Sequence, residues 1–205
     1  MTSASAQERM SRSGMSQRLS CFKAYDVRGV VPDELDEDLA YRIGRAYAAL
    51  IGPKKVCIGR DVRPSGEALS AALARGLADA GVDVVDIGVC GTEQVYFATF
   101  HMGLDGGVMV TASHNPPEYN GMKFVREQAR PISGDSGLQE IEQLARTGDF
   151  PPPAERKGTV TYVDTTDEYV RHLLSYVDVD SLKPFTVAAN PGNGCAGPVL
   201  ERLQK

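Results

Sequence analysis

A serine and a histidine stand side by side in a short polar run with two prolines, residues 111–118, which reads TASHNPPE. The apolar residues before it, 107–110, predict a short buried strand, because β-branched residues pack well in sheets. Asn115 and the prolines after it end that strand and disfavour a helix, since a residue before proline leaves the α region and proline donates no hydrogen bond. We therefore expect Ser113 and His114 to lie in a stiff loop at a strand end, where open α/β sheets bind their ligands.

The residues alone leave the role of Ser113 open. A serine that follows a strand is usually a turn or capping residue. A serine hydrolase would carry its nucleophile in a Gly-x-Ser-x-Gly elbow, and residues 111–115 lack both glycines. Asn120 and Gly121 predict a second tight turn shortly after the loop.

Strand-like and helix-like stretches alternate along the chain. Apolar residues at helical spacing predict a helix over 36–50, and Ser65 and Gly81 suit the N-cap and the C-terminal stop of a helix over 65–80. This βα order with short connections predicts an α/β fold, a mainly parallel mixed sheet covered by helices on both faces. The other predicted helices are 92–102, 135–146, 166–176 and a segment from 198 onwards, and the predicted strands are 55–59, 82–87, 107–111, 123–125 and 185–189.

Changes in composition divide the chain into four parts. Residues 1–20 are rich in Ser, Gln and Arg and lack an apolar core, so we expect a disordered extension rather than a signal peptide. Residues 21–149 are predicted to form an α/β domain that carries Ser113. Residues 150–158, FPPPAERKG, are predicted to be a linker. Residues 159–205 are interpreted as the incomplete start of a second α/β domain.

The composition is that of a globular protein and argues against several partners. A net charge of −5 offers no basic face for nucleic acid or an anionic membrane. No apolar run approaches the ~18 residues that a membrane-spanning helix needs. Scattered cysteines without a CxxC pair predict reduced thiols in a cytoplasmic protein, and the oligomeric state stays open. The cysteines are Cys21, Cys57, Cys90 and Cys195.

Four short motifs together carry a resemblance to a known family. The serine run is followed closely by residues 120–123, NGMK. Residues 22–29 read FKAYDVRG, residues 59–63 read GRDVR, and residues 129–135 read ARPISGD. In this order and spacing they resemble the phosphoserine loop, the opening segment and a second strand-end loop of the α-D-phosphohexomutases, the phosphomannomutase/phosphoglucomutase family. The ARPISGD segment is similar to the version in bacterial phosphomannomutases of sugar-nucleotide pathways.

The resemblance implies a phosphomannomutase-type phosphohexomutase, an intramolecular phosphotransferase that interconverts hexose 1-phosphate and 6-phosphate. Ser113 would lend a phosphoryl group to the sugar, form a 1,6-bisphosphate and recover the other phosphate. The substrate would be a mannose or glucose phosphate. Mg²⁺ would be held by the phosphoserine at Ser113 and by carboxylates from an Asp-Gly-Asp-x-Asp-Arg run, which this sequence lacks. We therefore expect the chain alone to be inactive and a longer parent protein to be active.

The resemblance also implies roles for residues near Ser113, because a phosphoserine needs cationic neighbours. The fork of Arg28 is expected to contact phosphate or sugar oxygens. Lys123 is expected to bind substrate and transfer a proton, and His114 to contact phosphate or handle a proton. Tyr25 is either a core or wall aromatic or a substrate contact. The residues interpreted as supporting or structural are Arg60, Arg63, His101 and His172.

Two other functions are weighed against the mutase. Residues 192–197, GNGCAG, match the GxGxxG fingerprint of a dinucleotide-binding oxidoreductase after a predicted strand and before a predicted helix. A glycine-rich turn explains the same residues, and the acidic ribose contact about 20 residues further on cannot be checked within the chain. A non-catalytic phosphosugar-binding module is the second alternative.

Overall fold

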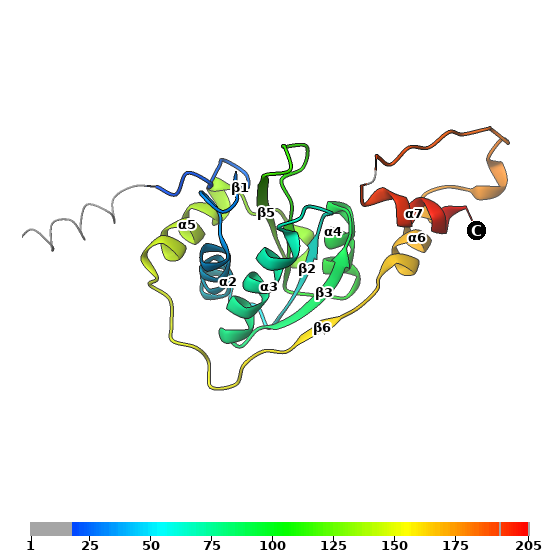
Figure 1. The fold of residues 1–205 in the computed structure, drawn as a ribbon. Helices are drawn as coiled ribbons and strands as arrows, with labels where there is room; N and C mark the ends of the chain where they lie inside the picture. Colours follow the sequence, from blue (N-terminus) through cyan, green and yellow to red (C-terminus); the bar gives the residue numbers. More distant parts are fainter. Residues whose placement is uncertain (1–17, 193, 205) are drawn as a thin grey trace, which may run out of the picture.

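The computed structural model describes residues 18–192 and 194–204. At its centre lies a mixed six-stranded sheet with the strand order β1-β5-β4-β2-β3-β6 (Figure 1). Strands β4, β2, β3 and β6 are parallel, whereas β5 runs antiparallel to both β1 and β4. This arrangement confirms the predicted α/β class. The strands are β1 (Val27–Val30), β2 (Lys55–Arg60), β3 (Asp83–Val89), β4 (Gly106–Val110), β5 (Tyr119–Arg126) and β6 (Val160–Tyr162).

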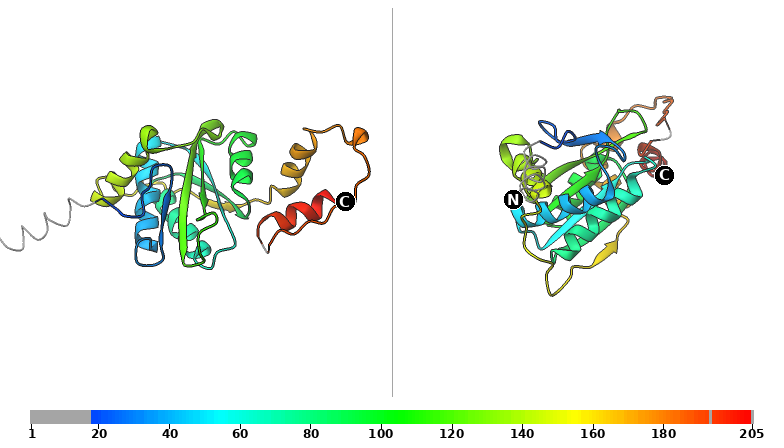
Figure 2. Two further views of the ribbon diagram at one scale, coloured as in Figure 1. Left: turned by 90° about the horizontal axis from the view of Figure 1, so that it is seen from above. Right: turned by 60° about the vertical axis from the view of Figure 1, so that its left-hand side comes forward.

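Helices cover both faces of the sheet, as the βα order predicted. Alternate residues of β2 enter different cores, because side chains alternate across a strand. Val56 and Ile58 join a large core with α2, α3 and α5, whereas Cys57 joins a smaller core with α4. Figures 1 and 2 show α6 and α7 beyond one edge of the sheet, and α6 contacts α4 through Tyr169 and Phe97. The helices are α2 (Glu37–Ile51), α3 (Gly66–Asp79), α4 (Thr92–His101), α5 (Leu138–Thr147), α6 (Thr166–Leu174) and α7 (Ala196–Leu203).

The ends of the helices follow local signals. Asp36 caps α2 by accepting a hydrogen bond from the Leu39 amide at 2.7 Å, and Gly52 ends the helix in the left-handed conformation. Ser65 occupies the N-cap position of α3, as predicted, but makes no side-chain cap. Its hydroxyl instead accepts a hydrogen bond from the Asn120 side chain at 2.9 Å. This serine therefore ties the helix to β5.

Three sequence-based expectations about strands were wrong or incomplete. Residues 185–189 form no strand, and Phe185 and Val187 are both 79% exposed. A strand needs a neighbour for its backbone hydrogen bonds, and no described strand lies beside this segment. Asn120 and Gly121 lie inside β5, not in a turn. Strands β1 and β6 were not predicted, because three or four residues carry too little pattern.

The predicted linker is attached to the domain rather than free. The amides of Ala154 and Gly158 donate to carbonyl oxygens at the end of α3, and β6 then pairs with β3 (Figure 1). The sheet thus continues beyond residue 158, where we had expected a second domain to begin. At the other end, residues 1–17 lie outside the described residues, but Leu19 and Ser20 bind Glu142 and Glu34. These contacts order the last residues of the expected N-terminal extension.

Candidate active site at the serine loop

Ser113 lies just beyond β4, in the loop that leads into β5. Its backbone adopts the left-handed conformation, with φ of 57°, which is uncommon for a residue other than glycine. The side chain is exposed, and its Oγ lies 3.3 Å from Nδ1 of His114. Two turns shape the loop, one closed by the Asn115 amide on Ala112 and the other by the Tyr119 amide on Pro116. The proline-bounded run therefore forms the expected exposed loop at a strand end.

Arg63, from the loop after β2, packs against the serine loop and binds its backbone. Its guanidinium donates hydrogen bonds to three backbone carbonyl oxygens of that loop, to the carbonyl oxygen of Tyr119 at the start of β5, and to the Asp61 carboxylate. The side chain is only 9% exposed. Asp61 also accepts a hydrogen bond from the Thr111 hydroxyl at 2.6 Å, and that hydroxyl accepts one from the Ser113 amide at 2.9 Å. We predicted that Arg63 supports the site, and its hydrogen bonds show that it contacts the backbone of the serine loop directly.

Arg28, Lys123 and Asp26 form an ion-pair cluster next to the loop. Arg28 donates to the Asp26 carboxylate at 2.6 Å and to the side-chain oxygen of Asn115 at 2.8 Å. The Lys123 ammonium lies 3.5 Å from the same Asp26 oxygen. Asp26 is 7% exposed, whereas the side chains of Arg28 and Lys123 are 23% and 31% exposed. Two partly accessible cations thus share one buried carboxylate, and one of them, Arg28, contacts the serine loop through Asn115.

Strand pairing brings these residues together. Val27 pairs with Met122 across β1 and β5, and both are buried in the large core. Because neighbouring side chains on a strand point to opposite faces, Arg28 and Lys123 point to the other face. Gly121 stands opposite Arg28, and a β-carbon there would collide with the Val27 carbonyl oxygen. Glycine at this position lets β1, β5 and the start of the serine loop approach closely.

Asp26 and Asn115 contact this pair of cations, although the sequence analysis assigned neither of them to the site. Asp26 lies within the FKAYDVRG motif, so an acidic residue two positions before Arg28 was an available signal. Tyr25 is 79% exposed, which excludes a core role. His101 and His172 lie in α4 and α6, in contact with the ring of Phe97, as expected for structural residues.

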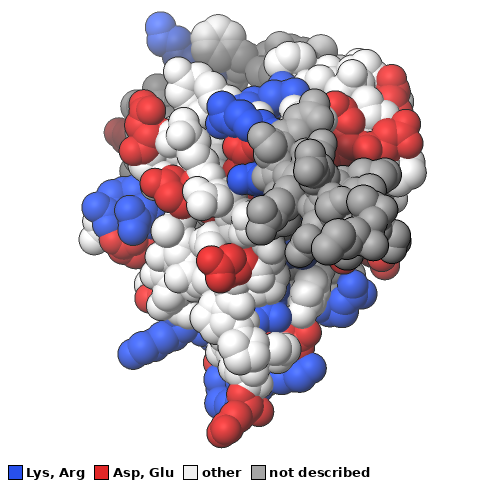
Figure 3. All heavy atoms as spheres, turned by 90° about the vertical axis from the view of Figure 1, so that its left-hand side faces the viewer, with Lys and Arg blue, Asp and Glu red and all other residues white. Residues whose placement is uncertain are grey.

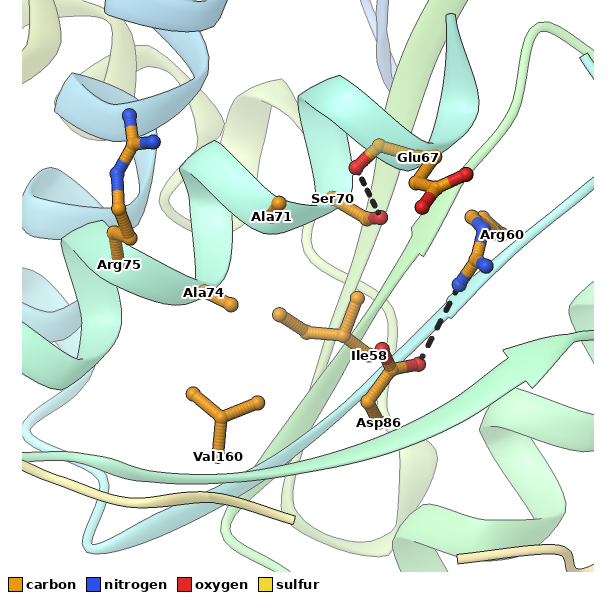
Figure 4. Close-up of a pocket in the computed structure, with 9 residues that line it drawn as sticks. All are labelled: Ile58, Arg60, Glu67, Ser70, Ala71, Ala74, Arg75, Asp86 and Val160. Carbon is orange, nitrogen blue, oxygen red and sulfur yellow. Dashed lines mark hydrogen bonds and ion pairs between the residues drawn. The ribbon is translucent and has the colours of Figure 1, made fainter. Parts of the chain in front are cut away.

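Arg60 points away from the serine loop. Its guanidinium lies 3.8 Å from Asp86 in a cavity of about 320 Å³ on the side of the sheet that carries α3 (Figure 4). Figure 4 also shows Glu67 beside Arg60, and Ile58 between Asp86 and the alanines of α3. No residue of the serine loop lines this cavity. We therefore do not assign Arg60 to the site.

The described residues contain no group of three or more His, Cys, Asp or Glu side chains that could hold a metal ion. In the described part of the chain, no helix has the length and hydrophobicity to cross a bilayer. On the visible part of one face, Figure 3 shows basic and acidic groups interspersed. The visible part of that face therefore lacks the continuous basic surface that nucleic-acid binding requires.

The structure lacks the strand that the dinucleotide-binding alternative requires before residues 192–197. A GxGxxG fingerprint should follow a strand and open a helix. Helix α7 does begin within the motif, at Ala196, but residues 185–189 before it form no strand. Residue 193, inside the motif, lies outside the described residues.

Comparisons with known proteins agree with these motifs. Residues 20–152 match the family model described as phosphoglucomutase/phosphomannomutase, alpha/beta/alpha domain I. The chain is 57% identical over 188 residues to a phosphomannomutase from Salmonella typhimurium, covering 91% of this chain and 41% of the relative. It is 56% identical over 189 residues to a phosphomannomutase from Escherichia coli, covering 92% of this chain and 41% of the relative.

A solved structure supports the same comparison. A phosphoglucomutase/phosphomannomutase family protein from Burkholderia thailandensis superimposes with a TM-score of 0.79 and 38% identity. The match covers 90% of this chain and 41% of that protein. The chain therefore spans about two fifths of the length of these curated and solved relatives.

Proposed function

Because the chain belongs to the phosphoglucomutase/phosphomannomutase family, we propose that it is the phosphoserine-bearing part of a phosphohexomutase of the phosphomannomutase type. The observation that carries this proposal is the exposed hydroxyl of Ser113 just beyond β4, in a loop whose Asn115 side chain binds Arg28. The reaction would interconvert hexose 1-phosphate and hexose 6-phosphate, with mannose or glucose phosphate as substrate.

The proposed chemistry is two phosphoryl transfers. In the first, a free hydroxyl of the hexose phosphate attacks the phosphorus on Ser113, the Oγ–P bond breaks, and a new sugar O–P bond forms. The proton of the sugar hydroxyl passes to a base, the released Ser113 oxygen takes up a proton, and a 1,6-bisphosphate results. In the second, the bisphosphate is bound in the opposite orientation and the Ser113 hydroxyl attacks its other phosphorus. The sugar O–P bond at that position breaks, the Oγ–P bond forms again, and a proton passes from the serine hydroxyl to the released sugar oxygen. Such transfers depend mainly on positioning and on charge stabilisation.

The residues around Ser113 suit those tasks. We assign Arg28 to the phosphoryl or sugar oxygens, because its fork can bind two oxygens at once. We assign proton transfer and a substrate contact to Lys123, and phosphate contact to His114, whose ring nitrogen lies 3.3 Å from Ser113 Oγ. Asp26 would hold Arg28 and Lys123 in place. Tyr25, exposed beside this cluster, is proposed to contact the sugar.

A magnesium ion is implied by the family resemblance, with phosphorylated Ser113 as one oxygen ligand. The described residues do not complete such a site. Asp26 is paired with two cations, and Asp61 with Arg63 and the Thr111 hydroxyl, so neither offers a free carboxylate. No step above depends on the metal.

We also propose a cytoplasmic location and a two-domain division. The thiols of the described cysteines are all free, which suits a reducing compartment. The second α/β domain is proposed to begin after β6, since that strand pairs with β3 of the first sheet.

The experiment that tests the function measures phosphoryl transfer to the purified chain by intact-mass spectrometry. The chain alone is expected not to interconvert hexose phosphates, but a single transfer to Ser113 does not require that turnover. We expect incubation with a hexose 1,6-bisphosphate to add ~80 Da, the mass of one phosphoryl group. Ser113→Ala should prevent the addition. Ser175→Ala, which removes an exposed hydroxyl from the end of α6, should not. Equal phosphorylation of the Ser113→Ala protein, or none of the unaltered chain, would contradict the proposal.

A further inference from the structure

We propose that Arg63 is the positioning residue of the serine loop, and that its guanidinium holds the backbone conformation that presents the Ser113 hydroxyl for phosphoryl transfer. The catalytic part of this inference rests on the proposed function. The structural part, the dependence of the loop on one guanidinium, stands without it.

The contacts of Arg63 use its whole donor set. Nη1 donates to the carbonyl oxygens of Pro116 and Tyr119 at 2.6 and 2.9 Å. Nη2 donates to those of Ser113 and Asn115 at 2.9 and 2.7 Å. Nε donates to the Asp61 carboxylate at 3.1 Å. Each of the five N–H groups of a guanidinium can therefore be assigned a partner.

The direction of these contacts explains why the loop needs a cation. Four carbonyl oxygens, three from the serine loop and one from the first residue of β5, converge on one guanidinium with their negative ends close together. Without a central donor they would repel one another and lose hydrogen bonds that water could replace only by opening the loop. One of the four belongs to Ser113 itself, the residue with the uncommon positive φ. Arg63 thus stabilises the conformation that aims the hydroxyl outward.

A second route joins Arg63 to the same residue. Asp61 accepts from Arg63 and from the Thr111 hydroxyl, and that hydroxyl accepts from the Ser113 amide. The backbone of Ser113 is therefore held on its carbonyl side directly and on its amide side through two side chains. Both routes end at the residue that carries the proposed chemistry.

A lysine could not reproduce this arrangement. Its ammonium is a single nitrogen with three donors, whereas the guanidinium is a planar group with five donors in fixed directions. Arg60 provides a matched control, because it lies three residues earlier, carries the same charge and pairs with Asp86 away from the loop. The inference therefore predicts different results for two arginines of one short segment.

The first experiment measures amide hydrogen exchange of the full chain by mass spectrometry. In Arg63→Ala we expect residues 112–120 to exchange at least about tenfold faster, while residues 37–51 of α2 keep their rate. Arg63→Lys should restore little of the protection, and Arg60→Ala should leave the loop unchanged. Unchanged exchange of the loop in Arg63→Ala would overturn the inference.

Chemical rescue separates a specific role from general destabilisation. Millimolar guanidinium chloride, far below denaturing concentrations, should enter the space left in Arg63→Ala and restore loop protection. Ammonium chloride at the same ionic strength should not. If Arg63→Ala accelerates exchange throughout the chain and guanidinium restores nothing, Arg63 is only a stabilising residue and the proposal fails.

The rate of phosphoryl transfer from hexose 1,6-bisphosphate to Ser113 tests the catalytic part. Arg63→Ala should lower the maximal single-turnover rate about tenfold or more, with little change in the half-saturating concentration, and guanidinium should restore the rate. A change confined to the half-saturating concentration would overturn the positioning role. If the unaltered chain accepts no phosphoryl group but the exchange results hold, the proposed function fails and the structural part of the inference stands.

Discussion

At the scale of single residues, the site depends on a carboxylate that takes no direct part in the proposed chemistry. Asp26 is 7% exposed and pairs with both Arg28 and Lys123. A buried carboxylate in contact with two cations offsets their charge and fixes their directions. Because Arg28 also binds Asn115, a substitution of Asp26 that moves Arg28 should also alter the conformation of the serine loop.

We expect Asp26→Asn to destabilise the chain and to strengthen anion binding. The amide keeps the shape of the carboxylate but removes its charge, so Arg28 and Lys123 lose their partner. The free energy of unfolding in urea should fall by about 1–3 kcal/mol. Isothermal titration should show tighter binding of inorganic phosphate, because two uncompensated cations remain.

The control for this prediction is Asp33→Asn, which alters an exposed carboxylate that forms no salt bridge with any of the described residues. Its unfolding free energy should change by no more than about 0.5 kcal/mol. If Asp26→Asn proves as neutral as this control, the ion-pair cluster does not organise the site.

At the scale of secondary-structure elements, two aspartates, one in α3 and one in β3, bind the segment 156–159 that leads into β6. Asp83, at the start of β3, accepts hydrogen bonds from the amide and hydroxyl of Thr159 and from Arg156. Asp79, at the end of α3, binds Lys157 at 2.7 Å. These contacts lower the pKa of both carboxyls below the ordinary value of 3.8. The main causes are the Thr159 amide for Asp83 and the Lys157 side chain for Asp79.

We expect this attachment to be lost in acid. A carboxyl whose pKa is lowered by folding contributes stability that is complete above its unfolded pKa and disappears as the pH falls through the folded value. The amide signal of Thr159 in NMR spectra should therefore shift only below about pH 4. Asp83→Asn should move the signal at neutral pH and remove its acid transition, with the amides of α2 as the internal control. A Thr159 amide that is indifferent to Asp83→Asn would refute the attachment.

At the scale of the whole molecule, the cysteines report on the packing of both cores. Cys21 belongs to the large core, and Cys57 and Cys90 to the small one. Burial raises the pKa of Cys21 to about 11 and that of Cys57 to about 12, and it raises the pKa of Cys90 as well. Cys195 also has a raised pKa, caused mainly by burial, but is partly exposed before α7. The thiolate is the reactive form of cysteine. Cys21, Cys57 and Cys90 should therefore react slowly for two reasons: they are buried, and their raised pKa values leave little thiolate.

We expect one cysteine to be alkylated rapidly in the native chain and all four to be alkylated rapidly in the unfolded chain. Alkylation with iodoacetamide at neutral pH, followed by peptide mapping, should modify Cys195 first. The other three cysteines should react only as fast as the cores open, and denaturant should make them equivalent. Cys195→Ser should remove the early modification. Labelling of Cys57 as rapid as that of Cys195 would show that the small core is not closed.

The sequence by itself determined the features whose causes lie within a few residues. Asn115 and its two prolines predicted an exposed loop around Ser113, because proline restricts its own backbone and that of the residue before it. The N-cap position of α3, Ser65, was predicted for the same reason, although its hydroxyl makes no cap hydrogen bond. The α/β class followed from hydrophobic periodicity, which each helix carries within itself.

Only the tertiary structure decided which distant residues meet. Arg63 reaches the serine loop across about fifty positions, and Lys123 meets Asp26 because β1 pairs with β5 in one register. The apolar pattern of residues 185–189 predicted a strand that the fold does not form, whereas residues 160–162 became one by pairing with β3. A strand and an ion pair both need a partner, and a local pattern does not specify where that partner lies.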